Sequence, residues 1–212
     1  MRHMEECLDL PLKEVLQIMQ DRLMSQSTYF GVQTLKSPTD FWVYQEILFT
    51  QQPDVIVEIG NFCGGNLLAL AHLCDALGRG RVIGIDVSHA NVPEVVRSHP
   101  RITLIEGDAC AMFPQVKAQL TASDRVLVIE DSSHTFENTL NILTTYAELI
   151  PVEGYFIVED SICYHGLEVG PQPGPYEAIE AFAANHPQFV IDRSQESFLI
   201  TWNPKGYLKR VQ

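Results

Sequence analysis

The sequence is poor in the groups that would cross-link a fold or hold a polyanion. Its five cysteines are an odd number and include no C-x-x-C pair, so we expect neither a disulfide framework nor a zinc ribbon, and a reducing compartment suits the chain. Lysine and arginine number 14 against 27 aspartates and glutamates, which gives a net charge of −13. A surface of that sign repels phosphate backbones, so nucleic acid is not an expected partner.

Long apolar runs and a secretion signal are missing as well. No run approaches the ~20 residues of a membrane span, and the N-terminus carries Glu5, Glu6 and Asp9 where a signal peptide would be basic and then apolar. We therefore expect a cytoplasmic protein without a membrane partner. The 212 residues suffice for one domain with a sizeable core.

Short apolar segments alternate with helical ones from residue 51 onward. We expect strands at 55–59, 81–87, 102–106, 125–129 and 155–158, separated by helices at 64–77, 92–98, 109–120, 136–149 and 176–185, with two closing strands at 189–192 and 198–202. This alternation predicts an α/β fold with a mostly parallel, doubly wound sheet and helices on both faces. The closing strands, joined by a short link, predict an antiparallel C-terminal edge. Residues 1–50 contribute N-terminal helices, at 11–24 and 41–50, and residues 51–212 form the Rossmann-like core of the same single domain, 1–212.

Acidic residues stand where the central strands end. Glu58 lies in the first strand, Asp86 ends the second and Asp108 follows the third, while Glu130-Asp131 and Glu159-Asp160 end the fourth and fifth. Ligands of open α/β sheets bind outside the carboxyl ends of the strands, so these carboxylates should surround one crevice. Helix capping would explain Asp108 or Asp131 singly, but it does not require adjacent acidic pairs.

A glycine-rich turn follows the first strand and reads Glu58-Ile59-Gly60-Asn61-Phe62-Cys63-Gly64-Gly65. Glycines let the backbone approach a ligand closely, although the spacing differs from G-x-G-x-x-G. With Asp86 placed to bind ribose hydroxyls, the turn predicts an adenosine-containing ligand. A sulfonium gains from carboxylates that would repel a pyrophosphate, which favours S-adenosylmethionine over NAD. An NAD-binding oxidoreductase remains the alternative.

The acidic residues at the ends of the fourth and fifth strands also predict a metal site. Asp131, Glu159 and Asp160 can supply hard oxygen ligands to Mg²⁺. Because adjacent strand residues point to opposite faces, Glu159 and Asp160 reach one ion only if the chain bends at the strand end. His134 would lie at the same rim and take a proton from a metal-bound hydroxyl, unless it is simply a helix-start residue. The glycine- and proline-rich segment 163–175 is either a lid over the crevice or a plain surface connection.

At these residues the sequence resembles the cephalosporin hydroxylase family of S-adenosylmethionine-dependent enzymes, whose relatives include metal-dependent sugar and rhamnosyl O-methyltransferases. The similar stretches are 31–35, 37–40, 44–47, 57–65, 82–86, 102–108, 131–135, 154–160, 174–175 and 198–211.

The resemblance implies a role for each matching residue. It places the methyl donor at Glu58, Gly60, Gly65, Asp86 and Asp108, to which we add Asn61 of the same turn. It implies magnesium ligands at Asp131, Glu159 and Asp160 and a catalytic base at His134. Glu130 is a departure, because the family often has an apolar residue before the aspartate.

We therefore expect a Rossmann-like class I methyltransferase with S-adenosylmethionine and Mg²⁺ as cofactors. It would methylate a hydroxyl of a sugar or another small secondary metabolite, with His134 and Asp131 as catalytic residues. Two other interpretations remain open: an oxygenase, although non-haem iron wants two histidines and one carboxylate, and an accessory protein that binds the donor without turnover. Family analogy also leads us to expect a homo-oligomer.

Overall fold

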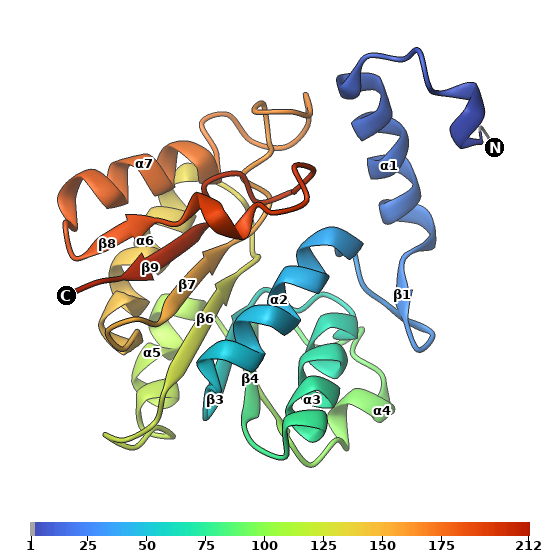
Figure 1. Ribbon diagram of the computed structural model, residues 1–212. Helices are drawn as coiled ribbons and strands as arrows, with labels where there is room; N and C mark the ends of the chain where they lie inside the picture. The colour runs from blue at the N-terminus through green and yellow to red at the C-terminus, as the bar shows by residue number, and fades with distance from the viewer. Residues whose placement is uncertain (1–2) are drawn as a thin grey trace.

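A seven-stranded sheet forms the centre of the computed structural model, which describes residues 3–212 (Figure 1). The strand order is β5-β4-β3-β6-β7-β9-β8. The strands are β3 (Val55–Ile59), β4 (Arg81–Asp86), β5 (Ile102–Glu106), β6 (Val126–Glu130), β7 (Tyr155–Val158), β8 (Phe189–Ile191) and β9 (Tyr207–Arg210). The first five are parallel, and β9 runs antiparallel to β7 and β8. The predicted mostly parallel sheet with an antiparallel C-terminal edge is therefore confirmed.

The last strand lies further along the chain than we predicted. Residues 198–202 form no strand, and Phe198 and Leu199 are exposed in a loop, Leu199 with a left-handed φ of 66°. Tyr207 and Leu208 are instead fully buried, because β9 inserts between β7 and β8. The connection between β8 and β9 consequently spans residues 192–206 and is not the short link we expected.

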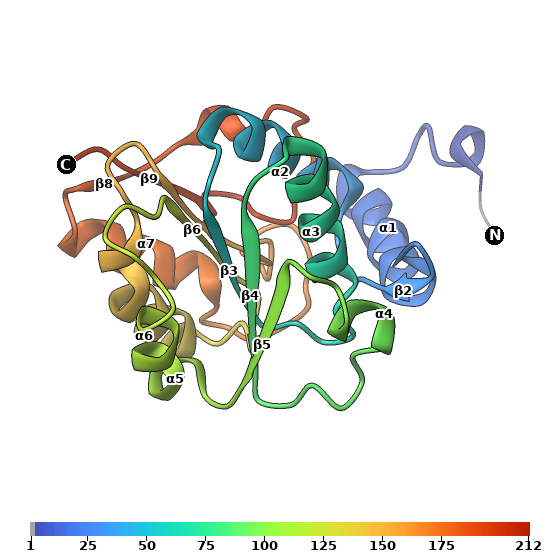
Figure 2. The ribbon, with the colours of Figure 1, turned by 90° about the horizontal axis from the view of Figure 1, so that it is seen from below.

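Helices cover both faces of the sheet, as the alternation predicted (Figure 2). One face carries α2 (Pro38–Gln51), α3 (Gly65–Leu77) and α4 (Glu94–Arg97), and the other carries α5 (Ala109–Lys117), α6 (Phe136–Tyr146) and α7 (Pro175–Asn185). Side chains alternate along each strand, so that Ile56 packs under the first set while Val55 and Val57 pack under the second. Both faces of the sheet are thus apolar and covered by helices, so the polar residues at the carboxyl ends of the strands are where a ligand site can form.

The N-terminal region contains more than the two predicted helices. Helix α1 (Leu12–Gln26) follows a short 3₁₀ helix, η1 (Met4–Glu6), and stands beside the body of the molecule (Figure 1). Between α1 and α2 lies an unpredicted antiparallel hairpin of β1 (Thr28–Tyr29) and β2 (Val32–Gln33). Its turn has two consecutive left-handed residues, at φ 48° and 83°, as tight hairpins prefer.

Two further 3₁₀ helices, η2 (Ala147–Leu149) and η3 (Arg193–Gln195), complete the elements. Within residues 3–212, no helix combines the length and the apolarity that crossing a lipid bilayer requires.

Candidate functional site

Two hollows meet at the carboxyl ends of β3 and β6, with Gly60 and Asp131 lining both. The Lys36 hollow, about 350 Å³, is also lined by Lys36, Glu58, Asn61, Gly65, His134 and Asp160. The Asp86 hollow, about 480 Å³, is also lined by Asp86, Ser88, Asp108, Ser133 and Asn138. Every predicted site residue except Glu159 therefore lines one hollow or the other, and the strand ends converge as expected.

Backbone amides hold the carboxylates of the Asp86 hollow. Asp86 Oδ2 accepts hydrogen bonds from the amides of Asn61 (2.7 Å) and Phe62 (3.0 Å), and its Oδ1 accepts from Ser88 N at 3.1 Å. Asp108 Oδ1 accepts from Ala111 N at 2.9 Å and caps α5. The capping role that we considered for Asp108 is thus present. Asp86 gives the glycine-rich turn its shape.

The glycines of the turn make room for other parts of the chain. Gly60 has a φ of +87°, and a Cβ atom there would lie 1.9 Å from the carbonyl oxygen of Asp131. A Cβ atom on Gly65 would lie 2.5 Å from the carbonyl oxygen of Gln33 in the hairpin. The absence of side chains therefore lets the residues after β6 and the β1–β2 hairpin lie directly against the glycine-rich turn.

Two buried asparagines line the Lys36 hollow. Asn61 donates from Nδ2 to Glu58 O at 3.1 Å, while its Oδ1 lies 2.9 Å from His89 Nε2. Asn66 donates to Glu58 Oε1 at 2.5 Å, and its own Oδ1 is buried without a partner. Sequence reasoning missed Asn66, which carries an unused acceptor at the wall of the hollow.

A lysine that sequence reasoning also missed lies among the carboxylates. Lys36 Nζ donates to Asp131 Oδ2 at 2.5 Å and to Glu159 Oε1, and it lies 3.8 Å from Glu58 Oε1. Burial alone would lower the pKa of Lys36, but the three carboxylate charges outweigh it and raise that pKa. No local pattern marks residue 36, because it lies in the connection between β2 and α2, far in sequence from its partners.

Burial raises the carboxylate pKa values in this hollow. The pKa of Glu58 rises to about 8, mainly through burial and against the charge of Lys36. The pKa values of Asp131 and Glu159 also rise through burial, with Lys36 opposing both shifts. The carboxylates are therefore crowded and short of positive charge, a condition that favours binding of a cation.

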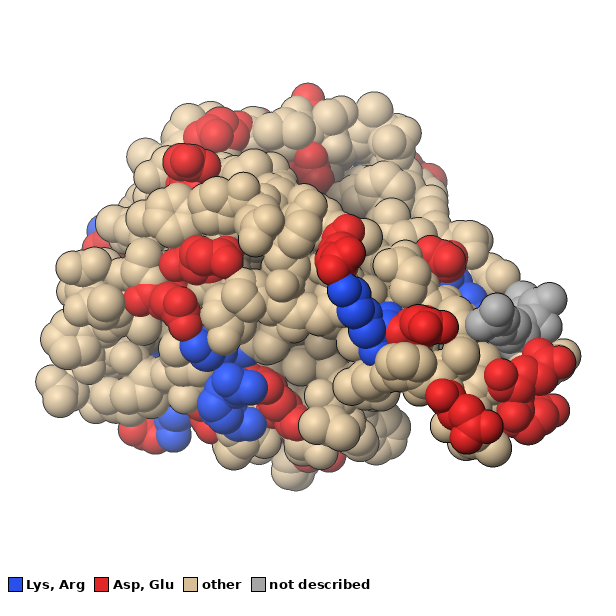
Figure 3. Space-filling view, turned by 90° about the horizontal axis from the view of Figure 1, so that it is seen from above, with Lys and Arg blue, Asp and Glu red and all other residues tan. Residues whose placement is uncertain are grey.

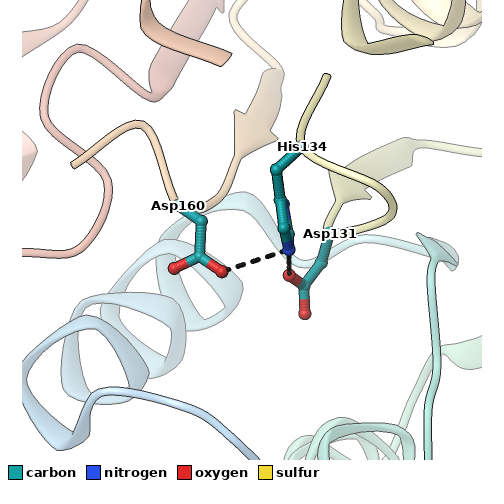
Figure 4. A group of neighbouring side chains, drawn as sticks. All are labelled: Asp131, His134 and Asp160. Carbon is teal, nitrogen blue, oxygen red and sulfur yellow. Dashed lines mark ion pairs between the residues drawn. The ribbon is translucent and has the colours of Figure 1, made fainter. Parts of the chain in front are cut away.

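On the other side of Asp131 from Lys36, His134 and Asp160 complete the cluster of charged side chains (Figure 4). His134 Nε2 lies 3.3 Å from Asp160 Oδ2 and 4.0 Å from Asp131 Oδ1. Burial is the largest single influence and lowers the pKa of His134, but the negative charges of Asp160, Asp131, Glu130 and Glu159 together raise it. Asp160 has a left-handed φ of 53°, so the chain does bend at the end of β7. The bend turns Glu159 towards Lys36 and Asp160 towards His134.

The donor atoms of this cluster fit a divalent cation. Ligand atoms of Asp131, His134 and Asp160 all lie within 4.8 Å of one another, and so do those of Glu58, Asp131 and Glu159. His134 Nδ1 is buried and has no hydrogen-bond partner. Carboxylate oxygens are the preferred ligands of Mg²⁺. The three predicted ligands are thus divided between two groups that share Asp131.

Glu130 points away from this cluster and holds the turn that carries His134. It is fully buried, and its Oε1 accepts from Ser132 N (3.2 Å) and Ser132 Oγ, while its Oε2 accepts from Thr139 Oγ1 at 3.3 Å. Asn138 Nδ2 in turn donates to Ser132 Oγ at 2.7 Å. The departure from the family pattern is therefore a buried hydrogen-bonded support, and not an additional ligand in the cluster.

An apolar wall closes the Lys36 hollow on the side of α1. The wall consists of Met24, Ile162, Leu167, Val169 and Trp202. Trp202 Nε1 donates to Gln20 Oε1 at 2.6 Å, which ties α1 to the C-terminal loop. Cys163 and Gly170 also line the hollow, so the first part of the segment 163–175 forms part of the wall.

The face of the molecule in Figure 3 carries more acidic than basic side chains. Acidic side chains are spread over the face in Figure 3, and the basic ones lie beside them in small groups. With a net charge of −13, the field of the whole molecule attracts cations.

Comparison with known proteins identifies related sequences and structures. Residues 21–211 match the family model described as rhamnosyl O-methyltransferase/CmcI. The rhamnosyl O-methyltransferase of Mycobacterium tuberculosis is 32% identical over 193 residues, 88% of this chain and 79% of that protein. The Mycobacterium leprae enzyme is 32% identical over 194 residues, 87% of this chain and 83% of its own length. A structure of CmcI with Mg and SAM superposes with a TM-score of 0.71 and 25% identity, covering 89% of this chain and 78% of that chain.

Proposed function

Because the chain belongs to the rhamnosyl O-methyltransferase/CmcI family, we propose that it transfers a methyl group from S-adenosylmethionine to a sugar hydroxyl with the help of Mg²⁺. S-adenosylmethionine-dependent O-methyl transfer is the activity class of this chain, and the sugar acceptor and the ion are the proposed part. One observation carries the proposal. Asp131, His134 and Asp160 gather in a hollow that shares Gly60 and Asp131 with the Asp86 hollow.

The donor fits the Asp86 hollow and the adjoining glycine-rich turn. Asp86 and Asp108 supply carboxylates for the ribose and adenine end from the Asp86 hollow. Glu58 and the unpartnered Oδ1 of Asn66 offer acceptors for an amino group from the adjoining wall of the Lys36 hollow. The sulfonium gains from the surrounding negative charge. We propose as donor-binding residues Glu58, Gly60, Asn61, Gly65, Asp86 and Asp108.

We propose that Asp131, Glu159 and Asp160 hold the divalent cation. Asp131 Oδ1 faces His134, and Asp160 follows Glu159 at the bend after β7. When bound, such an ion orients an acceptor hydroxyl and lowers its pKa. The CmcI structure that contains Mg and SAM supports the same pairing of cofactors for this chain.

We propose that His134 takes the proton of the acceptor hydroxyl. Its Nε2 lies 3.3 Å from Asp160 Oδ2 and 4.0 Å from Asp131 Oδ1, so a hydroxyl held at these carboxylates would lie beside this ring nitrogen. The carboxylates of Asp160 and Asp131 stabilise the imidazolium that results, as an acidic partner does for histidine bases in general. The two hollows bring donor and acceptor side by side, and this proximity supplies much of the rate enhancement.

The lining of the Lys36 hollow suits an uncharged acceptor. Lys36 is the only lysine or arginine among the described residues that line it, and three carboxylates already surround its ammonium group. A nucleotide-linked sugar would bring a diphosphate that finds no unpaired lysine or arginine side chain there. The apolar wall of Met24, Val169 and Trp202 instead suits a sugar joined to an apolar group.

Formation of S-adenosylhomocysteine tests this function. With an uncharged 6-deoxyhexose glycoside as acceptor, we expect turnover that EDTA abolishes and Mg²⁺ restores. Asp131→Asn should lose the metal-dependent turnover while keeping most of the donor affinity. Turnover that is insensitive to EDTA would exclude the metal, and donor binding without turnover on any hydroxyl would instead indicate an accessory protein. A cytoplasmic homo-oligomer remains our proposal, which light scattering and cell fractionation would test.

A further inference from the structure

Lys36 is a buried cation that the methyl-transfer chemistry does not require. It lies outside the alternating core, in the connection between the hairpin and α2, yet only 9% of it is exposed. Its partners stand at the carboxyl ends of three neighbouring parallel strands: Glu58 in β3, Asp131 after β6 and Glu159 after β7. A segment from outside the core therefore joins the ends of the three central strands.

The three carboxylates lie close together in a buried place and need a positive charge among them. Glu58 and Glu159 are almost completely buried, and Asp131 has a half-buried side chain next to both. Like charges that are close and buried repel one another strongly unless a cation lies between them. The ammonium group of Lys36, with its three N–H donors, meets that need without any bound ion.

The same carboxylate groups would be shared between Lys36 and a divalent cation. Asp131 Oδ2 and Glu159 Oε1 accept hydrogen bonds from Lys36 Nζ, and Asp131 Oδ1 faces His134. Both residues are among the ligands that we propose for Mg²⁺. Two positive charges in this hollow would also repel each other, and the burial of Lys36 weakens screening by solvent.

We propose that Lys36 is a tethered cation that competes with Mg²⁺ for Asp131 and Glu159 and so sets how tightly the hollow binds the ion. This inference rests on the proposed function in its assumption that a divalent cation binds at these carboxylates. Lys36 keeps the strand ends together in the ion-free protein, and it weakens ion binding by its charge. The hollow then fills only when free Mg²⁺ is abundant.

Isothermal titration of the metal-free full chain with MgCl₂, at mildly alkaline pH, tests the competition. Lys36→Met removes the charge and keeps the apolar stem, Lys36→Gln keeps a hydrogen-bond donor, and Lys36→Arg keeps the charge. We expect the Mg²⁺ Kd to fall about tenfold or more in the first two variants and to stay near the wild-type value in the third. Lys13→Met is the matched control, because Lys13 pairs with Glu168 at the exposed surface and should leave the Kd unchanged.

An unchanged or higher Kd in both uncharged variants would overturn the competition. Asp160→Asn separates this failure from a failure of the proposed function. If the wild type binds Mg²⁺ and Asp160→Asn does not, the metal site stands whatever Lys36 does. If no protein binds Mg²⁺, both proposals fail, whereas binding in Lys36→Met alone supports the competition and refutes metal use by the wild type.

Melting temperatures provide a second readout. Metal-free Lys36→Met should melt below the wild type, and saturating MgCl₂ should raise its melting temperature more than that of the wild type. A variant that remains unfolded in saturating MgCl₂ would count against the competition, because the ion should then take the place of the lysine.

Discussion

The Asp86 and Lys36 hollows lie side by side, yet their carboxylates are held in different ways. In the Asp86 hollow, Asp86 and Asp108 accept hydrogen bonds from backbone amides within 25 residues along the chain. In the Lys36 hollow, Asp131 and Glu159 bond to a side chain that lies 95 and 123 residues away. The first arrangement follows from a strand end and its turn, and the second exists only in the complete tertiary structure.

Gly60 lines both hollows, so its substitution should damage both and have the largest effect. In Gly60→Ala the new Cβ atom would meet Asp131 O at 1.9 Å, on a backbone with a φ of +87°. We expect the free energy of unfolding to fall by more than about 3 kcal/mol, since backbone cannot move aside cheaply. Urea unfolding followed by circular dichroism measures this loss.

Gly78→Ala is the matched control for that substitution. Gly78 has a φ of +70°, but a Cβ atom there meets nothing within 4 Å. The loss should therefore be about 1 kcal/mol, which is the cost of the left-handed backbone alone. Equal losses at the two positions would show that the approach of Asp131 to Gly60 does not matter.

Exchanging one carboxylate in each hollow should separate donor binding from turnover. Asp160→Asn weakens the cation site and the partner of His134, so we expect kcat to fall about 10²–10⁴-fold with little change in affinity for S-adenosylhomocysteine. Asp86→Asn loosens the glycine-rich turn, so we expect that affinity to fall about tenfold. Calorimetry and initial rates measure both quantities. Loss of the same quantity in both variants would mean that the hollows do not work separately.

The difference between local contacts in the Asp86 hollow and long-range contacts in the Lys36 hollow also explains what could be predicted from the sequence. Apolar runs, strand-end acids and the turn around Gly60 are local signals, so the sheet and the carboxylates of both hollows were predictable. Lys36 was not, because its role depends on a hairpin that folds against Gly65 and delivers it to distant strands. The last strand was misplaced because residues 198–202 are apolar enough for a strand, but Asp40 holds Thr201 and Trp202 in a loop. Both failures involve long-range contacts, which no short segment encodes.

Substitutions of Glu130 test whether the turn that carries Ser132 and His134 needs its buried support. Glu130→Leu would leave Ser132 N, Ser132 Oγ and Thr139 Oγ1 without an acceptor, so we expect a loss of about 1–3 kcal/mol in stability and lower turnover. Glu130→Gln keeps one carbonyl oxygen and should lose less. Glu148→Gln, at an exposed pair with Lys117, should change stability by less than about 0.5 kcal/mol. If Glu130→Leu were as stable as the wild type, the hydrogen bonds around Ser132 would have no supporting role.

The part of the apolar wall that α1 contributes should affect binding of the acceptor alone. Its disruption should have the smallest effect of the substitutions considered. Gln20→Leu removes the acceptor of Trp202 Nε1, a bond of 2.6 Å that ties α1 to the edge of the Lys36 hollow. We expect a loss of about 1 kcal/mol in stability and a KM for the acceptor that rises a few-fold, because the wall loosens where the apolar group would lie. The Asp86 hollow has no residue from α1, so the affinity for S-adenosylhomocysteine should not change.

Gln17→Leu provides the comparison within the same helix. Within residues 3–212, Gln17 bonds only to Asp21 on the exposed side of α1, at 3.1 Å, so both the stability and the acceptor KM should remain close to the wild-type values. A weaker affinity for S-adenosylhomocysteine in Gln20→Leu would contradict the division between the hollows, because it would mean that α1 reaches the donor as well. An unchanged acceptor KM would place the acceptor away from the apolar wall, and a change in KM alone would locate it between α1 and His134.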